Sequence, residues 1–177
     1  ILPVFNRYAQ QELVNTTLSF RNMTEKFQYR GLDDPSIYYT PDYNNFVLNQ
    51  RSSFNALAAA FIAEKNPAKA RETLLFSLEK MPDVGVPYDY TTAETVSLLF
   101  EVGEKDKALE IAKVLAARAI DMADYLVRVR DYGRELQISV VVLGELQRTL
   151  YAYGEADLAK KYEEAYEKYG RILQGGV

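Results

Sequence analysis

The sequence predicts an all-α fold in which about seven helices pack in consecutive pairs as a right-handed superhelix. Apolar residues recur at helical spacing along most of the 177 residues, and short turns containing proline or glycine interrupt them. Hydrophobic residues make up 48% of the chain, enough to bury a core. We expect no strand.

The first residues, 1–14, show little periodicity and are expected to form an extended lead-in. A helix should follow to about Tyr29, capped by Asn15 or Thr16 and ended by Gly31. Residues 31–45 should form a loop, and the next helix should begin near Asn44. We expect residues 15–173 to form a single domain.

The best-defined helix pair lies between Phe54 and Pro82, with its turn at Lys65-Asn66-Pro67. Small residues on one helix lie opposite large ones on the other, which lets the two helices approach closely. Together with the closing proline, this pattern resembles the tetratricopeptide repeat (TPR). The matching positions are Phe54, Leu57, Ala58, Phe61, Ala70, Leu74, Ser77 and Pro82.

Two further turns have the same character and begin at Gly103 and Gly154. Each places an alanine, Ala108 or Ala159, where the second helix would pack on the first, as Ala70 does in the first pair. The spacing of these alanines differs from the 34 residues of a regular repeat. We therefore expect TPR-like units of irregular length, at about 46–82, 90–132 and 134–172.

The helix after Lys105 should be long, because an apolar stripe with steps of three and four residues continues to near Tyr132. We expect this whole stripe to be buried. Its members are Ala108, Ala112, Leu115, Ala119, Met122, Leu126 and Val129.

Composition excludes several kinds of chemistry. The chain has neither cysteine nor histidine, which removes disulfides, the usual zinc sites, thiol nucleophiles and histidine-based triads. The carboxylates do not have the spacing of a calcium loop, and we predict no metal site, no cofactor and no catalytic residue. A net charge of −4 without a basic run argues against nucleic acid as a partner. No apolar run approaches the ~20 residues that span a bilayer.

The repeat resemblance implies a site for a protein or peptide partner. In tetratricopeptide proteins the first helix of each pair lines a concave groove that binds peptides, and polar and aromatic side chains there would hold an extended chain. The corresponding positions of this chain are Asn55, Tyr90, Ser97, Phe100, Arg148 and Tyr151.

The loop at 31–45 is a second candidate site, for a carbohydrate or other ligand. Paired carboxylates beside aromatic walls are typical of sugar-binding and sugar-cleaving sites. Turn formation by the aspartates and packing of the tyrosines by the loop itself remain open alternatives. The residues concerned are Asp33, Asp34, Tyr38, Tyr39 and Tyr43.

Residues 27–39 (FQYRGLDDPSIYY), 49–54 (NQRSSF) and 86–90 (VPYDY) carry a more particular resemblance. They resemble the C-terminal region of a family of large bacterial multi-pass membrane proteins, long catalogued as a domain of unknown function. That family is similar to the eukaryotic transmembrane protein O-mannosyltransferases. The resemblance implies a soluble tail on the periplasmic face of the inner membrane, with the transferase residues in membrane segments upstream of Ile1. We expect the chain, which begins with isoleucine, to be a fragment of such a protein.

Three hypotheses about function remain open at this point. The first is a non-catalytic interaction or scaffolding domain that binds its own membrane domain or a glycosylation acceptor. The second is a carbohydrate-binding or carbohydrate-active domain that uses the loop aspartates and tyrosines. The third is a purely structural cap.

Overall fold

The computed structural model describes residues 14–175, with the backbone alone for residues 41, 42, 44 and 45. Within 14–175 the chain forms seven α-helices packed in sequential pairs and no strand, which confirms the all-α prediction. The predicted lead-in lies outside the described residues, except for Val14.

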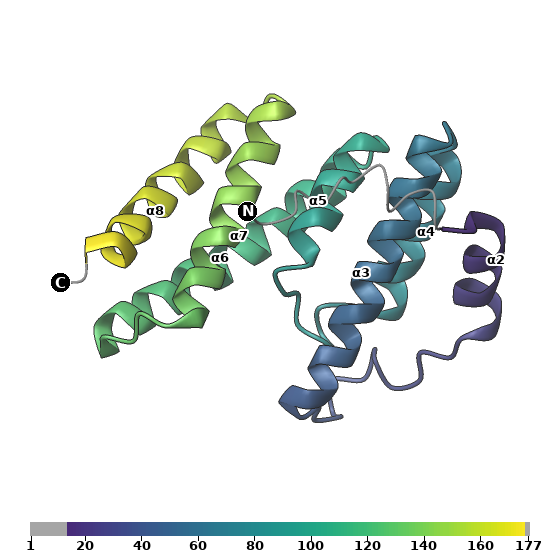
Figure 1. Ribbon diagram of the computed structural model, residues 1–177, viewed down its shortest axis with the longest axis horizontal. Coiled ribbons are helices and arrows are strands. Elements are labelled where there is room, and N and C mark those ends of the chain that lie inside the picture. The colour runs from purple at the N-terminus through teal and green to yellow at the C-terminus, as the bar shows by residue number, and fades with distance from the viewer. Residues whose placement is uncertain (1–13, 176–177) are drawn as a thin grey trace, which may run out of the picture. The chain divides into compact units, whose positions relative to one another are not determined.

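The helices follow one another as Figure 1 shows. They are α2 (Thr16–Arg21), continued by a π-helix, η1 (Asn22–Lys26), then α3 (Pro41–Ala63), α4 (Pro67–Lys80), α5 (Thr92–Glu101), α6 (Lys105–Val129), α7 (Arg134–Ala152) and α8 (Ala156–Gly175). The chain divides into two compact units between Tyr88 and Asp89. That 15–173 forms one domain stays a prediction.

Two predicted boundaries in the first unit are wrong. The first helical segment ends at Phe27, which is extended (φ −72°, ψ 145°), and Gly31 (φ +79°) belongs to a later turn. Helix α3 begins at Pro41 and not near Asn44, because a proline in the first helical turn loses no hydrogen bond and has a suitable φ.

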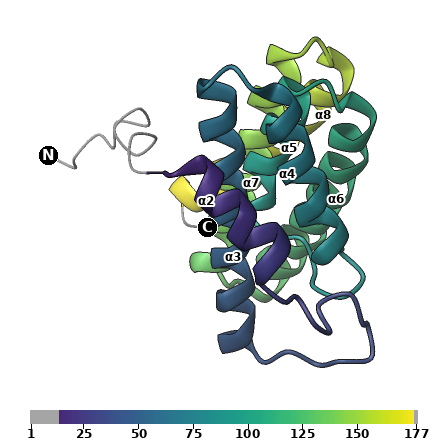
Figure 2. The same cartoon turned by 90° about the vertical axis from the view of Figure 1, so that its right-hand side faces the viewer.

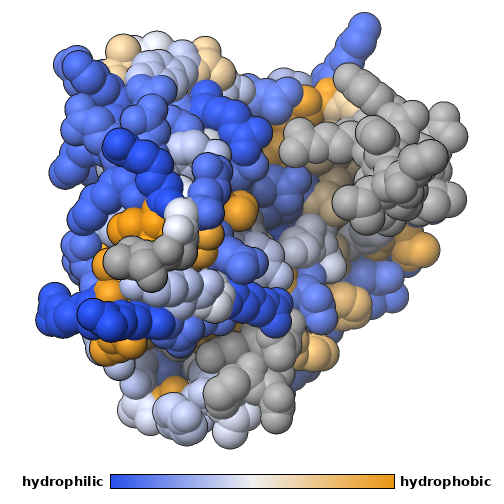
Figure 3. All heavy atoms as spheres, turned by 60° about the vertical axis from the view of Figure 1, so that its left-hand side comes forward, coloured by the Kyte–Doolittle hydropathy of each residue, from blue (hydrophilic) through white to orange (hydrophobic). Residues whose placement is uncertain are grey.

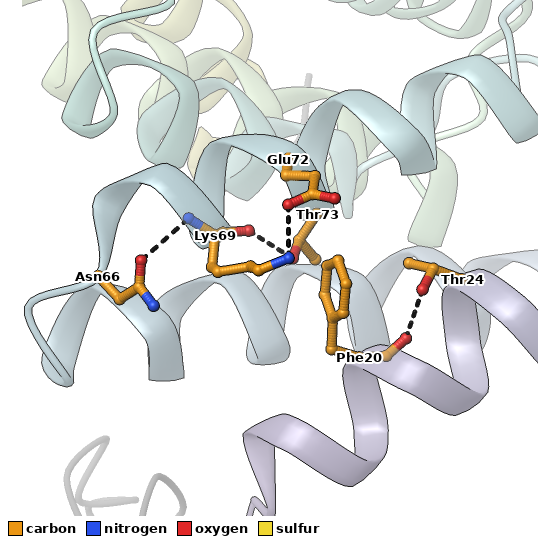
Figure 4. Close-up of polar contacts among 6 residues, drawn as sticks. All are labelled: Phe20, Thr24, Asn66, Lys69, Glu72 and Thr73. Atoms are coloured by element: carbon orange, nitrogen blue, oxygen red, sulfur yellow. Dashed lines mark hydrogen bonds and ion pairs between the residues drawn. The ribbon is translucent and has the colours of Figure 1, made fainter.

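Helix α2 runs across the α3–α4 pair in the N-terminal unit (Figure 2). Asn15 caps α2 as predicted, since its Oδ1 accepts a hydrogen bond from the Leu18 amide at 2.9 Å. The Phe20 ring meets Phe61 of α3 edge to face, with centroids 5.8 Å apart. The Lys69 ammonium of α4 lies 4.1 Å from the Phe20 ring centroid and pairs with Glu72 (Figure 4).

The α3–α4 pair has the close contact that the repeat pattern predicts. All seven signature residues inside the two helices are buried. They are Phe54, Leu57, Ala58, Phe61, Ala70, Leu74 and Ser77. Small side chains at Ala58 and Ala70 allow this approach, and Asn66 caps α4 by accepting from the Lys69 amide at 3.2 Å (Figure 4).

A buried arginine on α3 holds the loop that follows α4. The Arg51 side chain is only 4% exposed and donates hydrogen bonds to three backbone carbonyls. These belong to Met81 (3.2 Å), Val86 (2.5 Å) and Pro87 (2.9 Å). Charged donors make strong hydrogen bonds, so Arg51 fixes the position of residues 81–88 against the helix.

In the C-terminal unit α7 packs against both α6 and α8, and α5 packs against α6 and α7. The turns at Gly103 (φ +84°) and Gly154 (φ +82°) adopt the predicted left-handed conformation. Ala108 and Ala159 are fully buried, as expected of the residues where paired helices touch.

The prediction that the whole apolar stripe of α6 is buried is wrong at its C-terminal end. Met122 and Val129 are exposed, whereas the other five members are buried: Ala108, Ala112, Leu115, Ala119 and Leu126. A repeat of 3.5 residues drifts by ~20° per heptad from the 3.6-residue period of a straight helix. The row of Leu115, Met122 and Val129 therefore turns toward solvent along α6, while Leu126 of the other row stays buried.

A hydrogen bond and an ion pair connect α8 to α6 around the buried Tyr169. The hydroxyl of Tyr169 donates to Asp124 Oδ1 at 2.8 Å, and Lys168 Nζ pairs with the same oxygen at 2.9 Å. These two hydrogen bonds, Lys168 first, hold the pKa of the Asp124 carboxyl below its ordinary value.

Candidate interaction surfaces

Aromatic residues of the loop before α3 and of the first turns of α3 lie together at the surface. The rings of Tyr39 and Tyr43 stack with centroids 5.1 Å apart, and Tyr43 lies 6.2 Å from Phe46. Tyr38 is 83% exposed, while Tyr39 is half-buried. We call Tyr38, Tyr39, Tyr43 and Phe46 the loop aromatic cluster. The cluster offers ring faces for stacking. Of the three tyrosines predicted from the sequence, Tyr38 adjoins Tyr39 in the chain, and Tyr39 stacks on Tyr43.

The two loop carboxylates lie at the edge of this cluster. Loss of hydration raises the pKa of Tyr39, and the charges near it, from Tyr43 first and then Asp34 and Asp33, raise it further. Asp34 already accepts from the amide and hydroxyl of Ser36, at 2.9 and 2.6 Å, which lowers its pKa. Asp34 therefore forms the turn that the sequence left open as an alternative.

The segments that carry the membrane-protein resemblance meet in space around this loop. Tyr29 packs on Phe54 with ring centroids 5.9 Å apart, and its hydroxyl donates to the Met23 carbonyl at 2.8 Å. Burial raises the pKa of Tyr29 to about 12. Gly85 contacts the backbone of Leu32 so closely that a Cβ would not fit. Arg51 of 49–54 also donates to the Val86 and Pro87 carbonyls of 86–90, so the three blocks meet within the N-terminal unit.

The predicted groove residues are spread over both units and have different surroundings. In the N-terminal unit Asn55 is 1% exposed, so its side chain does not reach the described surface. In the C-terminal unit Phe100 is buried and stacks on Tyr153 with centroids 4.8 Å apart. Ser97 is half-buried and Tyr90 is exposed.

The last two groove residues, Arg148 and Tyr151, are both exposed on α7. Arg148 pairs with Glu145 at 2.6 Å, and the Tyr151 hydroxyl donates to Glu163 of α8 at 2.6 Å. That hydrogen bond is the main reason why the pKa of Tyr151 is raised. A groove continuous across Asn55 and the five C-terminal residues stays a prediction, because those residues belong to different units.

One surface of the C-terminal unit was not predicted. A shallow, wide-open hollow of about 610 Å³ lies against one face of α6. We call its described lining the α6 strip: Val114, Ala117, Arg118, Asp121, Met122 and Tyr125. Met122 and Tyr125 are 42% and 56% exposed. In space-filling view, hydrophobic side chains reach the surface in small groups between hydrophilic ones (Figure 3).

A sequence signal for the α6 strip does exist. Its members recur at i, i+3, i+4, i+7, i+8 and i+11, which is one face of a helix. Met122 was assigned to the core stripe instead, and the drift of that stripe explains the error. Arg51 gave no such signal, because nothing in its neighbours indicates that three carbonyls surround it.

No described helix has both the length and the apolar character to cross a bilayer. Among residues 14–175 no cluster of carboxylates could hold a metal ion. Comparison with protein-family models, curated proteins and solved structures finds no match to this chain.

Proposed function

We propose that this chain is a non-catalytic protein-interaction domain built from TPR-like helix pairs in a right-handed superhelix. The pairs α3–α4, α5–α6 and α7–α8, with buried alanines at their contacts, support this architecture. The observation that carries the function is the hollow on the α6 strip, which combines exposed Met122, Tyr125 and Arg118. Methionine, tyrosine and arginine are enriched in protein interfaces.

A photo-crosslinking amino acid at position 125 tests this proposal in cells that express the full-length protein. The matched control is position 141, since Val141 is also an exposed apolar residue on a helix of the same unit. We expect a protein adduct at 125 that is at least several-fold stronger than at 141. Met122→Lys should remove it, because truncating or charging a central contact residue commonly costs ~2 kcal/mol of binding energy. Equal adducts at 125 and 141 would refute the assignment of the surface.

We further propose that the domain is the periplasmic tail of a membrane glycosyltransferase-like protein. The resemblance of residues 27–39, 49–54 and 86–90 supports this origin. Fractionation of native cells with an antibody against the domain is the test. A band much heavier than the 20.2 kDa of this chain, in the membrane fraction, is the expected result. A soluble band of about this mass would overturn it.

Carbohydrate binding by the loop aromatic cluster is the second candidate function. The specific observation in its favour is the exposed Tyr38 beside the stacked pair of Tyr39 and Tyr43. Aromatic faces stack on sugar rings, and a neighbouring carboxylate such as Asp33 can accept hydrogen bonds from hydroxyl groups.

A glycan array followed by NMR titration tests this second candidate. We expect shifts in the ring protons of Tyr38 and Tyr43, and at least tenfold weaker binding after Tyr38→Ala. Tyr125→Ala is the matched control, because it removes an exposed tyrosine from the other unit. Binding that is equally strong in the Tyr38→Ala variant would exclude the cluster as the site.

A further inference from the structure

We propose that the α6 strip binds the α6 strip of a second copy of this chain, with the two helices antiparallel about a two-fold axis. This inference rests on the proposed function, because it names the partner of the same surface. A two-fold contact uses one patch on both copies, so the patch must be complementary to itself. The α6 strip has this property.

The two-fold axis would cross α6 at the height of the peptide bond between Ala119 and Ile120, and 'level' here means position along the helix axis. Each residue of the strip then lies level with a different residue of the strip in the second copy. Residues with this spacing would pair in this way whatever their identity, so the chemical character of the paired side chains is the evidence for the dimer. The levels pair Val114 with Tyr125, Ala117 with Met122, and Arg118 with Asp121. Val114 and Tyr125 lie near the centre of the strip and combine a smaller with a larger apolar side chain, whereas Ala117 and Met122 lie at its opposite edges.

The central level decides the orientation of the helices. In the antiparallel arrangement Arg118 lies level with Asp121 of the second copy, and this opposite-charge pair occurs twice across the axis. A parallel two-fold arrangement would place Arg118 level with Arg118 and Asp121 level with Asp121. Juxtaposed like charges cost several kcal/mol at an interface, which disfavours the parallel arrangement.

The edge of the contact offers a second pair of opposite charges. Glu110 and Arg128 are both exposed and lie at the same angle around α6, beside the strip. In the antiparallel arrangement they come within about one residue of the same level, roughly 1.5 Å along the axis. Glu110 also pairs with Lys107 of its own helix at 3.0 Å, so its charge is already at the surface.

The size of the strip indicates a weak dimer. Residues 114–125 span about 18 Å of helix, less than the full length of α6. One such helix face buries less than the ~800 Å² per partner of a standard interface. We therefore expect a dissociation constant in the micromolar range or weaker, and measurements must reach high protein concentration.

Charge reversal, followed by sedimentation equilibrium on the full chain, tests the pairing. Arg118→Asp and Asp121→Arg should each weaken self-association at least tenfold, because each variant meets its own copy with like charges. An equimolar mixture of the two variants should restore association, since every level then pairs opposite charges. Val141→Lys is the control and should leave association unchanged. Circular dichroism verifies that each variant remains helical.

Engineered thiols test the orientation, because the chain contains no other cysteine. Glu110→Cys and Arg128→Cys should give a dimer with a short bis-maleimide only when the two variants are mixed. Crosslinking of each variant with itself would instead indicate a parallel pair and overturn the antiparallel arrangement.

Failure of this inference and failure of the proposed function are distinguishable. A chain that stays monomeric at several hundred micromolar overturns the dimer. If position 125 nevertheless crosslinks to a different protein in cells, the interaction function stands and the partner is another protein. If it crosslinks to nothing, both proposals fall.

Discussion

Gly85 lies where two loops of the N-terminal unit touch backbone to backbone. A Cβ added there would lie 2.8 Å from the carbonyl carbon of Leu32 and 3.0 Å from Asp33 Cα, and closer still to the Leu32 oxygen. Ordinary contacts begin at 3.4 Å, and the Leu32 oxygen lies closer than its carbonyl carbon at 2.8 Å, so the loops would have to separate by clearly more than the 0.6 Å between 3.4 and 2.8 Å. No side chain can rotate to relieve this contact, because every atom concerned belongs to the backbone.

We therefore expect Gly85→Ala to lower the free energy of unfolding of the N-terminal unit by about 3 kcal/mol, the upper part of the range for overpacking. In a unit of this size that corresponds to a fall in melting temperature of about 10 °C or more. Thermal unfolding followed by circular dichroism measures this change. Hydrogen exchange should show faster opening of residues 27–40 while residues 134–175 are unaffected.

Gly170→Ala is the matched control. Gly170 lies inside α8 with no atom within 4 Å of an added Cβ, so alanine there should stabilise the helix by about 1 kcal/mol. A Gly85→Ala variant with wild-type melting and unchanged exchange in residues 27–40 would show that the two loops do not touch as described.

Four other substitutions follow from the described contacts. Arg51→Met should cost about 3 kcal/mol, because three backbone carbonyls, two of them in buried hydrogen bonds, lose their donor, and an unchanged urea midpoint would contradict this. Tyr169→Phe should cost about 1 kcal/mol and raise the pKa of Asp124 in an NMR titration; an unmoved pKa would exclude the hydrogen bond. The Asp124 pKa is lowered in the folded state, so its stabilisation is present above the ordinary carboxyl pKa of about 4 and is lost as the pH falls through the folded value. Asp124→Asn should cost under ~1 kcal/mol at pH 7, since the pair with Lys168 is half exposed, and should remove that acid dependence from urea titrations. The pKa of Tyr29 is raised, so its stabilising effect should be lost as the pH rises from 10.0 to about 12, and Tyr29→Phe should flatten this alkaline dependence.

Many of the candidate binding residues could be identified from the sequence, but their burial and their neighbours could not. Loop aromatics with nearby carboxylates were predicted, and the structure places Tyr39 on Tyr43 as a stacked pair. Asn55 was predicted at a binding surface and is buried instead, because a repeat position specifies which helix face a residue occupies and not what packs against it. The α6 strip was missed because Met122 was assigned to the core stripe, whose 3.5-residue period drifts around a straight helix.

The sequence by itself determined the helices, their order and the residues at which paired helices touch. Those features depend on local physics: a proline or glycine ends or begins a helix, and an alanine at a contact admits a close neighbour. Tertiary structure alone decided the role of Arg51, whose three acceptors lie at least 30 residues away in the chain. It also decided the intolerance of Gly85 for a side chain. Each of these depends on which distant backbone segment lies within a few ångströms of the residue, and the local sequence pattern does not indicate that.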